Sequence, residues 1–182
     1  MAEERRYLVL TAVGPDQPGL VQRISAAIAE SGANLEDSRM AILGGEFALI
    51  VLITCGAAQA QAVEQKLAAI GKEGTLSLSL RPTSKAQSPK SYLPYRIRVS
   101  GLDRSGIVAK VSGVLAGHSI NVARLDSRIS FAPESGTPMF LLNADLQIPS
   151  QTALAELRRD LAKACDEENL DFSFESGEHR ND

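Results

Sequence analysis

The chain has 182 residues, of which 44% are hydrophobic and only 4% aromatic, with no tryptophan. This composition suits a protein with an aliphatic core, and the length suits two small domains or one of medium size. The formal net charge of −3 argues against a protein whose main task is to hold a nucleic-acid backbone, because such proteins usually carry a basic face.

The cysteines and the N-terminus indicate the compartment. Cys55 and Cys165 stand far apart in apolar surroundings, so we expect free, buried thiols rather than a disulfide. No segment reaches the roughly 18 consecutive apolar residues of a membrane span, and the N-terminus lacks a cleavable leader pattern. We therefore expect a soluble, cytoplasmic protein.

The first predicted elements are a strand over residues 6–13 and a helix that follows a tight turn. The strand is an almost unbroken apolar run, which is typical of a strand covered on both faces. Asp16 is expected to be the N-cap of the helix, since its carboxylate can accept from free N–H groups of the first turn. Apolar residues recur at helical spacing over residues 20–28, and Gly32 is the expected C-cap.

The first half continues with three strands and a second helix. Strands are predicted at 34–43 and 46–55, around a Gly44-Gly45 hairpin, and at 75–81, where leucine alternates with serine. A helix is predicted at 58–70. The order βαββαβ is the ferredoxin-like unit, in which right-handed crossovers put both helices on one face of a four-stranded antiparallel sheet. The other face is expected to stay open unless something packs on it.

The first half repeats. The pattern of residues 14–40 returns as residues 101–129, and a shift of 87 residues superposes Gly14 on Gly101, Asp16 on Asp103, Gly19 on Gly106, Ser25 on Ser112 and Asn34 on Asn121. The triplet Asp37-Ser38-Arg39 recurs two residues late as Asp126-Ser127-Arg128, which suggests a bulge or a longer entry in the strand over 121–131. Such a repeat predicts two copies of one module.

We therefore predict an α+β fold with two ferredoxin-like domains, residues 1–81 and 95–175. Residues 82–94 hold three prolines, three serines and two lysines and are expected to form a partly stiff linker. The polar tail 176–182 is expected to be loose.

In the second half, Asp103 is the expected N-cap of a helix that carries Ile107 to Leu115. A second helix is expected after Pro149-Ser150. Strands are expected at 95–99, 121–131, 139–147 and 170–175.

The motif strand–G-x-D-x-x-G-[LI]-V–helix–x-N-[LV] occurs in both halves, over residues 14–35 and 101–122. With it the sequence resembles a tandem ACT-domain protein. The first half, YLVLTAVGPDQPGLV and then NLEDSRMAILGGEFALIVL, is similar to the glycine cleavage system transcriptional repressor family. The resemblance covers nearly the whole chain and is weaker in the second repeat, where Ser105 stands at the position of Pro18.

The resemblance implies a non-enzymatic regulator that senses a small molecule, most often an amino acid, with glycine as the first candidate. Such proteins lack a DNA-reading helix, so the implied partner is a transcriptional activator or another protein. The open faces and edge strands favour side-by-side pairing, within one chain or as a dimer, and we expect a homo-oligomer. Two alternatives stay open: a stand-alone small-molecule binder, and the regulatory part of a metabolic enzyme, as in formyltetrahydrofolate deformylase. Because the chain ends at Asp182 without a catalytic domain, the last is less expected.

The candidate binding site is the turn before the first helix of each repeat. A helix N-terminus supplies N–H donors for a carboxylate, and glycine lets a ligand approach the backbone. We expect the backbone over residues 17–20 to take the carboxylate, and the Asn34 amide oxygen with Asp16 to take the ammonium group. The full candidate set is Asp16, Gln17, Gly19, Leu20 and Asn34, with Asp103, Gly106, Ile107 and Asn121 in the second repeat.

Each candidate has a simpler structural explanation. Capping is favoured over ligand contact for Asp16 and Asp103, whereas helix packing explains Gly19 about as well as ligand approach. The Asp37-Ser38-Arg39 and Asp126-Ser127-Arg128 triplets are more often solvated strand, although their recurrence makes a partner contact plausible. No zinc spacing, nucleophile elbow, phosphate loop or dinucleotide fingerprint is present, so we expect no catalytic residue, metal or cofactor. RNA binding is disfavoured because the central strands lack exposed aromatic pairs.

Overall fold

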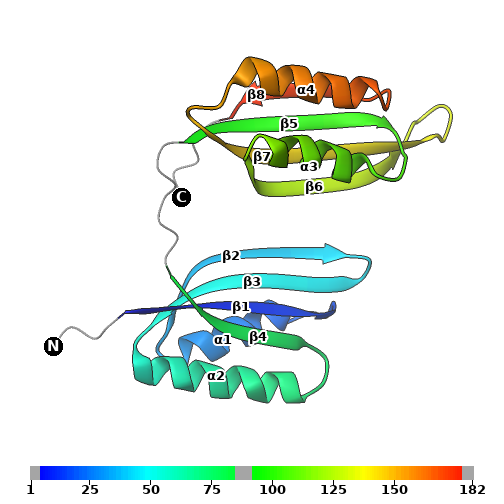
Figure 1. The fold of residues 1–182 in the computed structure, drawn as a ribbon. Coiled ribbons are helices and arrows are strands. Elements are labelled where there is room, and N and C mark those ends of the chain that lie inside the picture. The colour runs from blue at the N-terminus through cyan, green and yellow to red at the C-terminus, as the bar shows by residue number, and fades with distance from the viewer. Residues whose placement is uncertain (1–4, 85–91, 178–182) are drawn as a thin grey trace. The chain divides into compact units, whose positions relative to one another are not determined.

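The computed structural model describes residues 5–84 and 92–177. The chain divides into two compact units, and the division falls within the undescribed residues 85–91. Each unit is an α+β sandwich of one antiparallel sheet and two helices (Figure 1). This confirms the predicted fold class of two ferredoxin-like units.

The first unit follows the order βαββαβ. Its sheet has the strand order β2-β3-β1-β4, and all neighbouring strands are antiparallel. Helices α1 and α2 cover one face of it (Figure 1). The elements are β1 Arg6–Pro15, α1 Leu20–Ala29, β2 Asn34–Leu43, β3 Glu46–Cys55, α2 Ala57–Lys72 and β4 Ser77–Thr83.

The second unit repeats this topology with the strand order β6-β7-β5-β8. Helices α3 and α4 again lie on one face of the sheet (Figure 1). The elements are β5 Tyr92–Leu102, α3 Ile107–Gly117, β6 Asn121–Phe131, β7 Pro138–Pro149, α4 Leu154–Asp166 and β8 Asp171–Ser176.

The core of each unit lies between the sheet and its helices. In β1 the side chains of Leu8, Leu10 and Ala12 are buried against the helices, while those between them are more exposed. Val13 is 48% exposed, and Ile50 on β3 is 46% exposed. The expectation that the strand over 6–13 is covered on both faces is therefore wrong within the unit, because the long apolar run serves one core face and one open face.

Several predicted boundaries differ from the structure. Strand β4 occupies Ser77–Thr83 rather than 75–81, and β5 begins at Tyr92. The ends of the expected linker 82–94 are therefore strand, and its middle, 85–91, lies outside the described residues. Of the tail, Ser176 ends β8, and 178–182 lie outside the described residues.

The bulge predicted for β6 occurs in both repeats. The pairing of β6 with β7 shifts between Val122 and Arg124, and that of β2 with β3 shifts between Leu35 and Asp37. The bulge thus belongs to the shared module. It does not explain why the second charged triplet comes two residues late.

The first glycine of the motif serves close packing. A Cβ on Gly14 would lie 2.3 Å from the carbonyl oxygen of Thr75, and one on Gly101 would lie 2.5 Å from Cδ2 of Leu170. Both contacts are far inside van der Waals distance. Glycine at this position therefore lets the end of β1 or β5 approach the segment that enters the last strand of its unit.

Candidate functional site

The turn between β1 and α1 leaves the start of the helix uncapped by side chains. Gly19 is the N-cap, in the left-handed conformation with φ 94°, and no described side chain hydrogen-bonds to the cap. The first helical hydrogen bond runs from the Arg23 N–H to the Gly19 carbonyl at 2.9 Å. The N–H groups of residues 20–22 therefore have no partner within the helix and stand at the positive end of its dipole.

The predicted capping role of Asp16 is wrong. The helix is capped by Gly19, three residues further along the chain, and the Asp16 carboxylate makes no capping hydrogen bond. The backbone N–H of Asp16 instead donates to the carbonyl of Gly45 at 2.8 Å. This bond ties the end of β1 to the β2–β3 hairpin and leaves the start of α1 open.

Most of the first-repeat candidates lie around one cavity of about 490 Å³ beside this turn. A Cβ on Gly19 would meet no atom within 4 Å, so the space next to the cap is open. Met40 of β2 and Phe47 of β3 supply an apolar wall. The lining residues are Asp16, Gln17, Gly19, Leu20, Val21, Gln22, Ser25, Met40 and Phe47.

Sequence reasoning missed five of these lining residues. Ser25 carried a signal, because the repeat superposes it on Ser112. No sequence pattern pointed to Met40 and Phe47, because their position depends on how the β2–β3 hairpin folds back beside the end of β1. The remaining two, Val21 and Gln22, belong to the first turn of α1.

The second unit has the same turn geometry. Gly106 is the N-cap of α3 with φ 94°, and again no side chain of the described residues caps the helix. The Asp103 N–H donates to the Pro138 carbonyl at 3.1 Å, so Asp103 is not the predicted N-cap either. Ile107, like Leu20 in the first unit, is 3% exposed and belongs to the core.

Asn34 does not lie near the turn. It pairs with Thr54, whereas Gly14 at the end of β1 pairs with Phe47. Thr54 and Phe47 lie near opposite ends of β3, seven residues or roughly 23 Å apart at the rise of a strand. The expectation that Asn34 helps Asp16 to hold an ammonium group is therefore wrong.

Asn121 is displaced from the second turn in the same way. It pairs with Gln147, at the end of the sheet far from Gly106. Its side-chain amide donates to the Gln147 amide oxygen at 2.7 Å. Asn121 therefore does not join Asp103 and Gly106 in one site.

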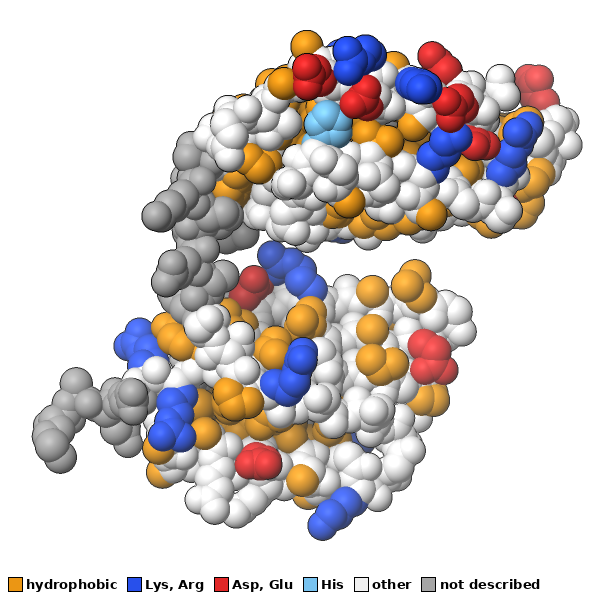
Figure 2. Space-filling model, in the orientation of Figure 1, with side chains coloured by type: hydrophobic (Ala, Val, Ile, Leu, Met, Phe, Trp, Pro, Cys, Tyr) orange, Lys and Arg blue, Asp and Glu red, His pale blue; other side chains and the backbone are white. Residues whose placement is uncertain are grey.

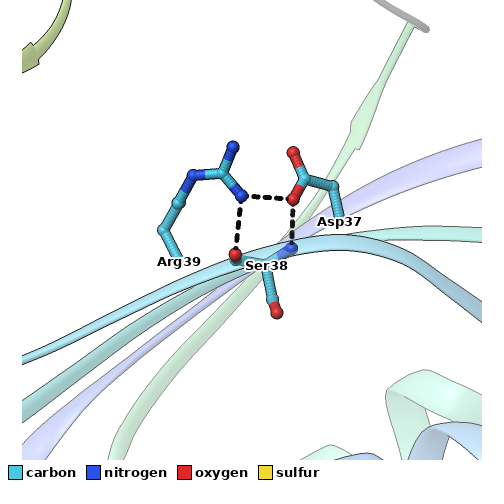
Figure 3. A network of polar contacts seen from close by, with 3 residues as sticks. All are labelled: Asp37, Ser38 and Arg39. Carbon is cyan, nitrogen blue, oxygen red and sulfur yellow. Dashed lines mark hydrogen bonds and ion pairs between the residues drawn. The ribbon is translucent and has the colours of Figure 1, made fainter. Parts of the chain in front are cut away.

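The first charged triplet forms a compact network on the edge strand β2 (Figure 3). The carboxylate of Asp37 accepts from the Ser38 N–H at 2.7 Å and pairs with the Arg39 guanidinium. Arg39 also donates to the Ser38 carbonyl at 2.9 Å. All three residues are exposed, so they form an accessible charged spot on a strand that also carries exposed apolar side chains.

The second triplet is not structurally equivalent to the first. Asp126 accepts from Arg124 at 2.7 Å, two residues before it, whereas Asp37 pairs with the arginine two residues after it. Arg124, not Asp126, occupies the position directly after the bulge that Asp37 holds in the first unit. The two identical Asp-Ser-Arg triplets therefore form different ion pairs on the two edge strands.

The two open sheet faces differ in chemistry. In the first unit Val9, Val13 and Ile50 lie on the open face. In the second unit a shallow hollow of about 260 Å³ is lined by charged and amide side chains of three strands, and Arg96 pairs there with Asp145 at 2.8 Å. The hollow is lined by Arg96, Arg98, Arg124, Asp126, Asn143 and Asp145.

Exposed hydrophobic side chains interrupt the polar surface of each unit (Figure 2). On β2 they are Leu35, Met40, Ile42 and Leu43, of which Leu43 is 74% exposed. On β6 they include Ile129 and Phe131. Edge strands with both free backbone groups and apolar side chains are typical places for pairing with another chain.

Burial or a hydrogen bond shifts the pKa of Cys55, Cys165 and Asp160, three groups away from the two turns. Both cysteines are free and buried, as predicted, and burial raises the pKa of the Cys55 and Cys165 thiols. His118 contacts Asp160 at 2.9 Å, and this hydrogen bond lowers the pKa of the Asp160 carboxyl.

Within residues 5–84 and 92–177 no cluster of three or more His, Cys, Asp or Glu could hold a metal ion. None of the helices in these ranges is long and apolar enough to cross a membrane.

Comparison with known proteins matches both units to one family. Residues 6–81 and residues 95–162 each match the ACT domain. The chain is 27% identical over 170 residues to the glycine cleavage system transcriptional repressor of Escherichia coli (strain K12), an alignment that covers 93% of this chain and 90% of that protein.

Solved structures with a similar fold are also known. An unknown protein from Galdieria sulphuraria is 31% identical, with a TM-score of 0.81 over 96% of this chain and all of that one. A candidate glycine cleavage system transcriptional repressor is 24% identical, with a TM-score of 0.68 over 95% of this chain and 99% of that chain. At that identity the second likeness concerns the fold.

Proposed function

This chain belongs to the ACT domain family, and we propose that it is a non-enzymatic, amino-acid-responsive regulator that acts through contacts with other proteins. The effector is an amino acid, with glycine as the first candidate. The partner is a transcriptional activator or another regulatory protein, and the chain works as a homo-oligomer. The observation that carries this proposal is the open helix start at Gly19, beside a cavity of about 490 Å³.

A small zwitterion matches the groups around this cavity. The free N–H groups at the start of α1 suit a carboxylate, and the helix dipole adds to the attraction. The Asp16 carboxylate lines the same cavity and suits the ammonium group. The apolar wall of Met40 and Phe47 disfavours an amino acid with a charged side chain. Glycine meets this condition, and it is the compound in the name of the Escherichia coli relative.

The regulatory role is supported by similarity and by surface. The Escherichia coli relative named a glycine cleavage system transcriptional repressor aligns with 93% of this chain. Every residue of β2 is exposed, and the strand carries both apolar residues and the Asp37–Arg39 pair. A ligand in the cavity at the Gly19 turn would contact Met40 of the same strand, so its binding can change how β2 meets a partner.

The effector is tested by measuring the melting temperature of the full chain with each of the twenty amino acids. A ligand that binds only the folded state raises it, and glycine is expected to do so. Calorimetric titration then compares wild type with Asp16→Asn, which is expected to lose about tenfold in affinity because a charge-assisted hydrogen bond is weakened. Asn34→Ala is the matched control and is expected to bind glycine like wild type. No stabilising amino acid, or equal affinity in Asp16→Asn, would contradict the proposed binding mode.

The partner is tested by affinity capture from cell extract with and without glycine. Recovery of a transcriptional regulator whose amount changes with glycine supports the proposal. If no regulatory protein is recovered under either condition, the chain is a small-molecule binder without this role.

A further inference from the structure

The open face of the first sheet carries an apolar patch over its two central strands, β1 and β3. The side chains of the patch alternate with the buried core residues of these strands, so they point away from the helices. Ile50 is 46% exposed and Val13 48%, and the others are half-buried. A contiguous apolar patch on a sheet face marks a contact surface. The patch consists of Val9, Val13, Ala48, Ile50 and Leu52, with Thr11 between them.

Charged side chains stand at the two ends of one row across this face. Arg81 on the edge strand β4 lies opposite Val9. Val9 lies opposite Leu52, and Leu52 lies opposite Asp37 on the other edge strand, β2. The row therefore has a cation at one edge, an anion at the other and apolar side chains between them. An apolar centre with a polar rim is the usual anatomy of a protein interface.

The charges of this row are complementary to those of a second copy. A two-fold rotation about an axis parallel to the strands lays the sheet face on the same face of another chain and exchanges the β2 and β4 edges. Arg81 of each copy then lies over Asp37 of the other, and the apolar side chains between them meet. In the next row Arg39 lies over Ser79, so no like charges face each other.

Asp37 has an oxygen atom available for this contact (Figure 3). Its bonds to described residues, from the Ser38 N–H and the Arg39 guanidinium, both end at Oδ1. The Oδ2 atom can therefore accept from an arginine of a second copy. Within one chain Arg81 and Asp37 are three strand spacings apart, about 14 Å, so they are too distant to pair with each other.

The open face of the second unit is a poor match for this patch. Its arginines Arg96, Arg98 and Arg124 would lose water against apolar side chains, which is costly for charged groups. The first sheet is also large enough to hold a second copy. Four strands about 4.8 Å apart and about 30 Å long span roughly 600 Å² before side-chain relief is added. A standard interface buries roughly 800 Å² per partner.

We propose that the open face of the first sheet binds the same face of a second copy of this chain, about a two-fold axis parallel to the strands. The inference rests on the homo-oligomer proposed above, although not on its effector. The contact is separate from pairing through the β2 edge, because Ile42 lies opposite Phe47, whose side chain is buried on the helix side. Chains that use both surfaces form a species larger than a dimer.

The test is sedimentation equilibrium of the full chain carrying Ile42→Lys, so that the sheet-face contact is studied without the edge contact. This variant is expected to be a dimer. Adding Ile50→Lys or Arg81→Asp is expected to raise the dissociation constant of the dimer at least about tenfold. Val108→Lys is the matched control on α3, and adding it is expected to leave the dissociation constant unchanged.

A charge exchange tests the proposed axis. Arg81→Asp places like charges over each other, and adding Asp37→Arg to it restores opposite charges, so most of the lost affinity should return. Circular dichroism of each variant confirms that it is folded.

Three results would overturn the proposal: a monomeric Ile42→Lys chain, an unchanged dissociation constant with Ile50→Lys, and no recovery in the charge-exchanged chain. If wild type itself is a monomer, the homo-oligomer proposed above fails as well. If wild type associates but Ile50→Lys changes nothing, only the sheet-face contact fails.

Discussion

Asn34 lies directly opposite Thr54 in the antiparallel register of β2 and β3, at the end of the sheet where β1 begins. The Gly19 turn lies at the other end, where β1 stops. The two ends of one sequence motif therefore line two different cavities. A mutation at Asn34 and one at Asp16 should for this reason have separable effects.

The motif glycines are expected to differ in their sensitivity to alanine. Gly14→Ala should destabilise the first unit by more than about 2 kcal/mol, because the new methyl group collides with the Thr75 carbonyl. Gly19→Ala should cost about 1–2 kcal/mol, since only the left-handed backbone opposes it. Urea unfolding followed by circular dichroism measures both.

The control for these variants is Gly113→Ala. This glycine is inside α3, has ordinary helical φ, and its Cβ would meet nothing within 4 Å. We expect the exchange to stabilise the second unit by up to about 1 kcal/mol. A larger loss for Gly19→Ala than for Gly14→Ala would show that the assigned roles are reversed.

Replacing Ser119 with glycine is expected to stabilise the second unit. It has φ 56° at the end of α3, where Gly32 stands in the first unit, and the Ile120 N–H closes the turn onto the Leu115 carbonyl at 3.0 Å. Ser119→Gly should stabilise the second unit by about 0.5 kcal/mol, because the relief of left-handed strain exceeds the added freedom of the unfolded chain. Thermal unfolding of Ser119→Gly and Ser119→Ala gives the comparison, and equal melting temperatures would contradict this prediction.

The contact of Lys110 with the end of α4 is expected to make the second unit sensitive to acid. Hydrogen bonds to Glu168 and then Glu167 raise the pKa of Lys110, and the bond to Lys110 lowers the pKa of Glu167. The stability that a lowered carboxyl pKa contributes is present above the unfolded-state pKa and is lost as pH falls through the folded-state pKa. Lys110→Met should therefore lower the melting temperature at neutral pH, with a difference from wild type that shrinks below about pH 4.

At high pH, the deprotonation of Lys110 itself removes the stability that this contact contributes. Because its pKa is raised, its contribution is complete below the unfolded-state pKa and is lost as pH rises through the folded-state pKa. Arg128→Met, at an exposed position on β6, is the control and should show no such pH dependence. If the melting temperatures of Lys110→Met and wild type differ by a constant amount across about pH 3–8, this prediction is wrong.

Self-association is expected to depend on β2. Ile42 is 50% exposed on this edge strand, so Ile42→Lys should weaken pairing without damaging the core. Light scattering after size-exclusion chromatography should show a smaller species than wild type. Val108→Lys, which places the same charge on α3 at a residue 37% exposed, should leave the mass unchanged. An unchanged mass for Ile42→Lys would assign association to another surface.

The order of elements and the duplication could be read from the sequence. Alternating and helical apolar spacing depends on neighbours along the chain, and the shift of 87 residues repeated both patterns with their glycines. Gly14 and Gly19 were both visible as motif residues. Which one prevents a clash and which one begins the helix was not, since that depends on Thr75 and on the path of the turn.

Two copies of one sheet-and-helix module were already specified by the order of residues, because local periodicity sets strands, helices and their succession. The folded chain was needed to establish that Asn34 lies far from Asp16, that Asp126 pairs with Arg124, and that Thr54 opens into a cavity. These relationships depend on strand register and on where each helix returns the chain. Residues far apart in sequence set both, so no local pattern contains them.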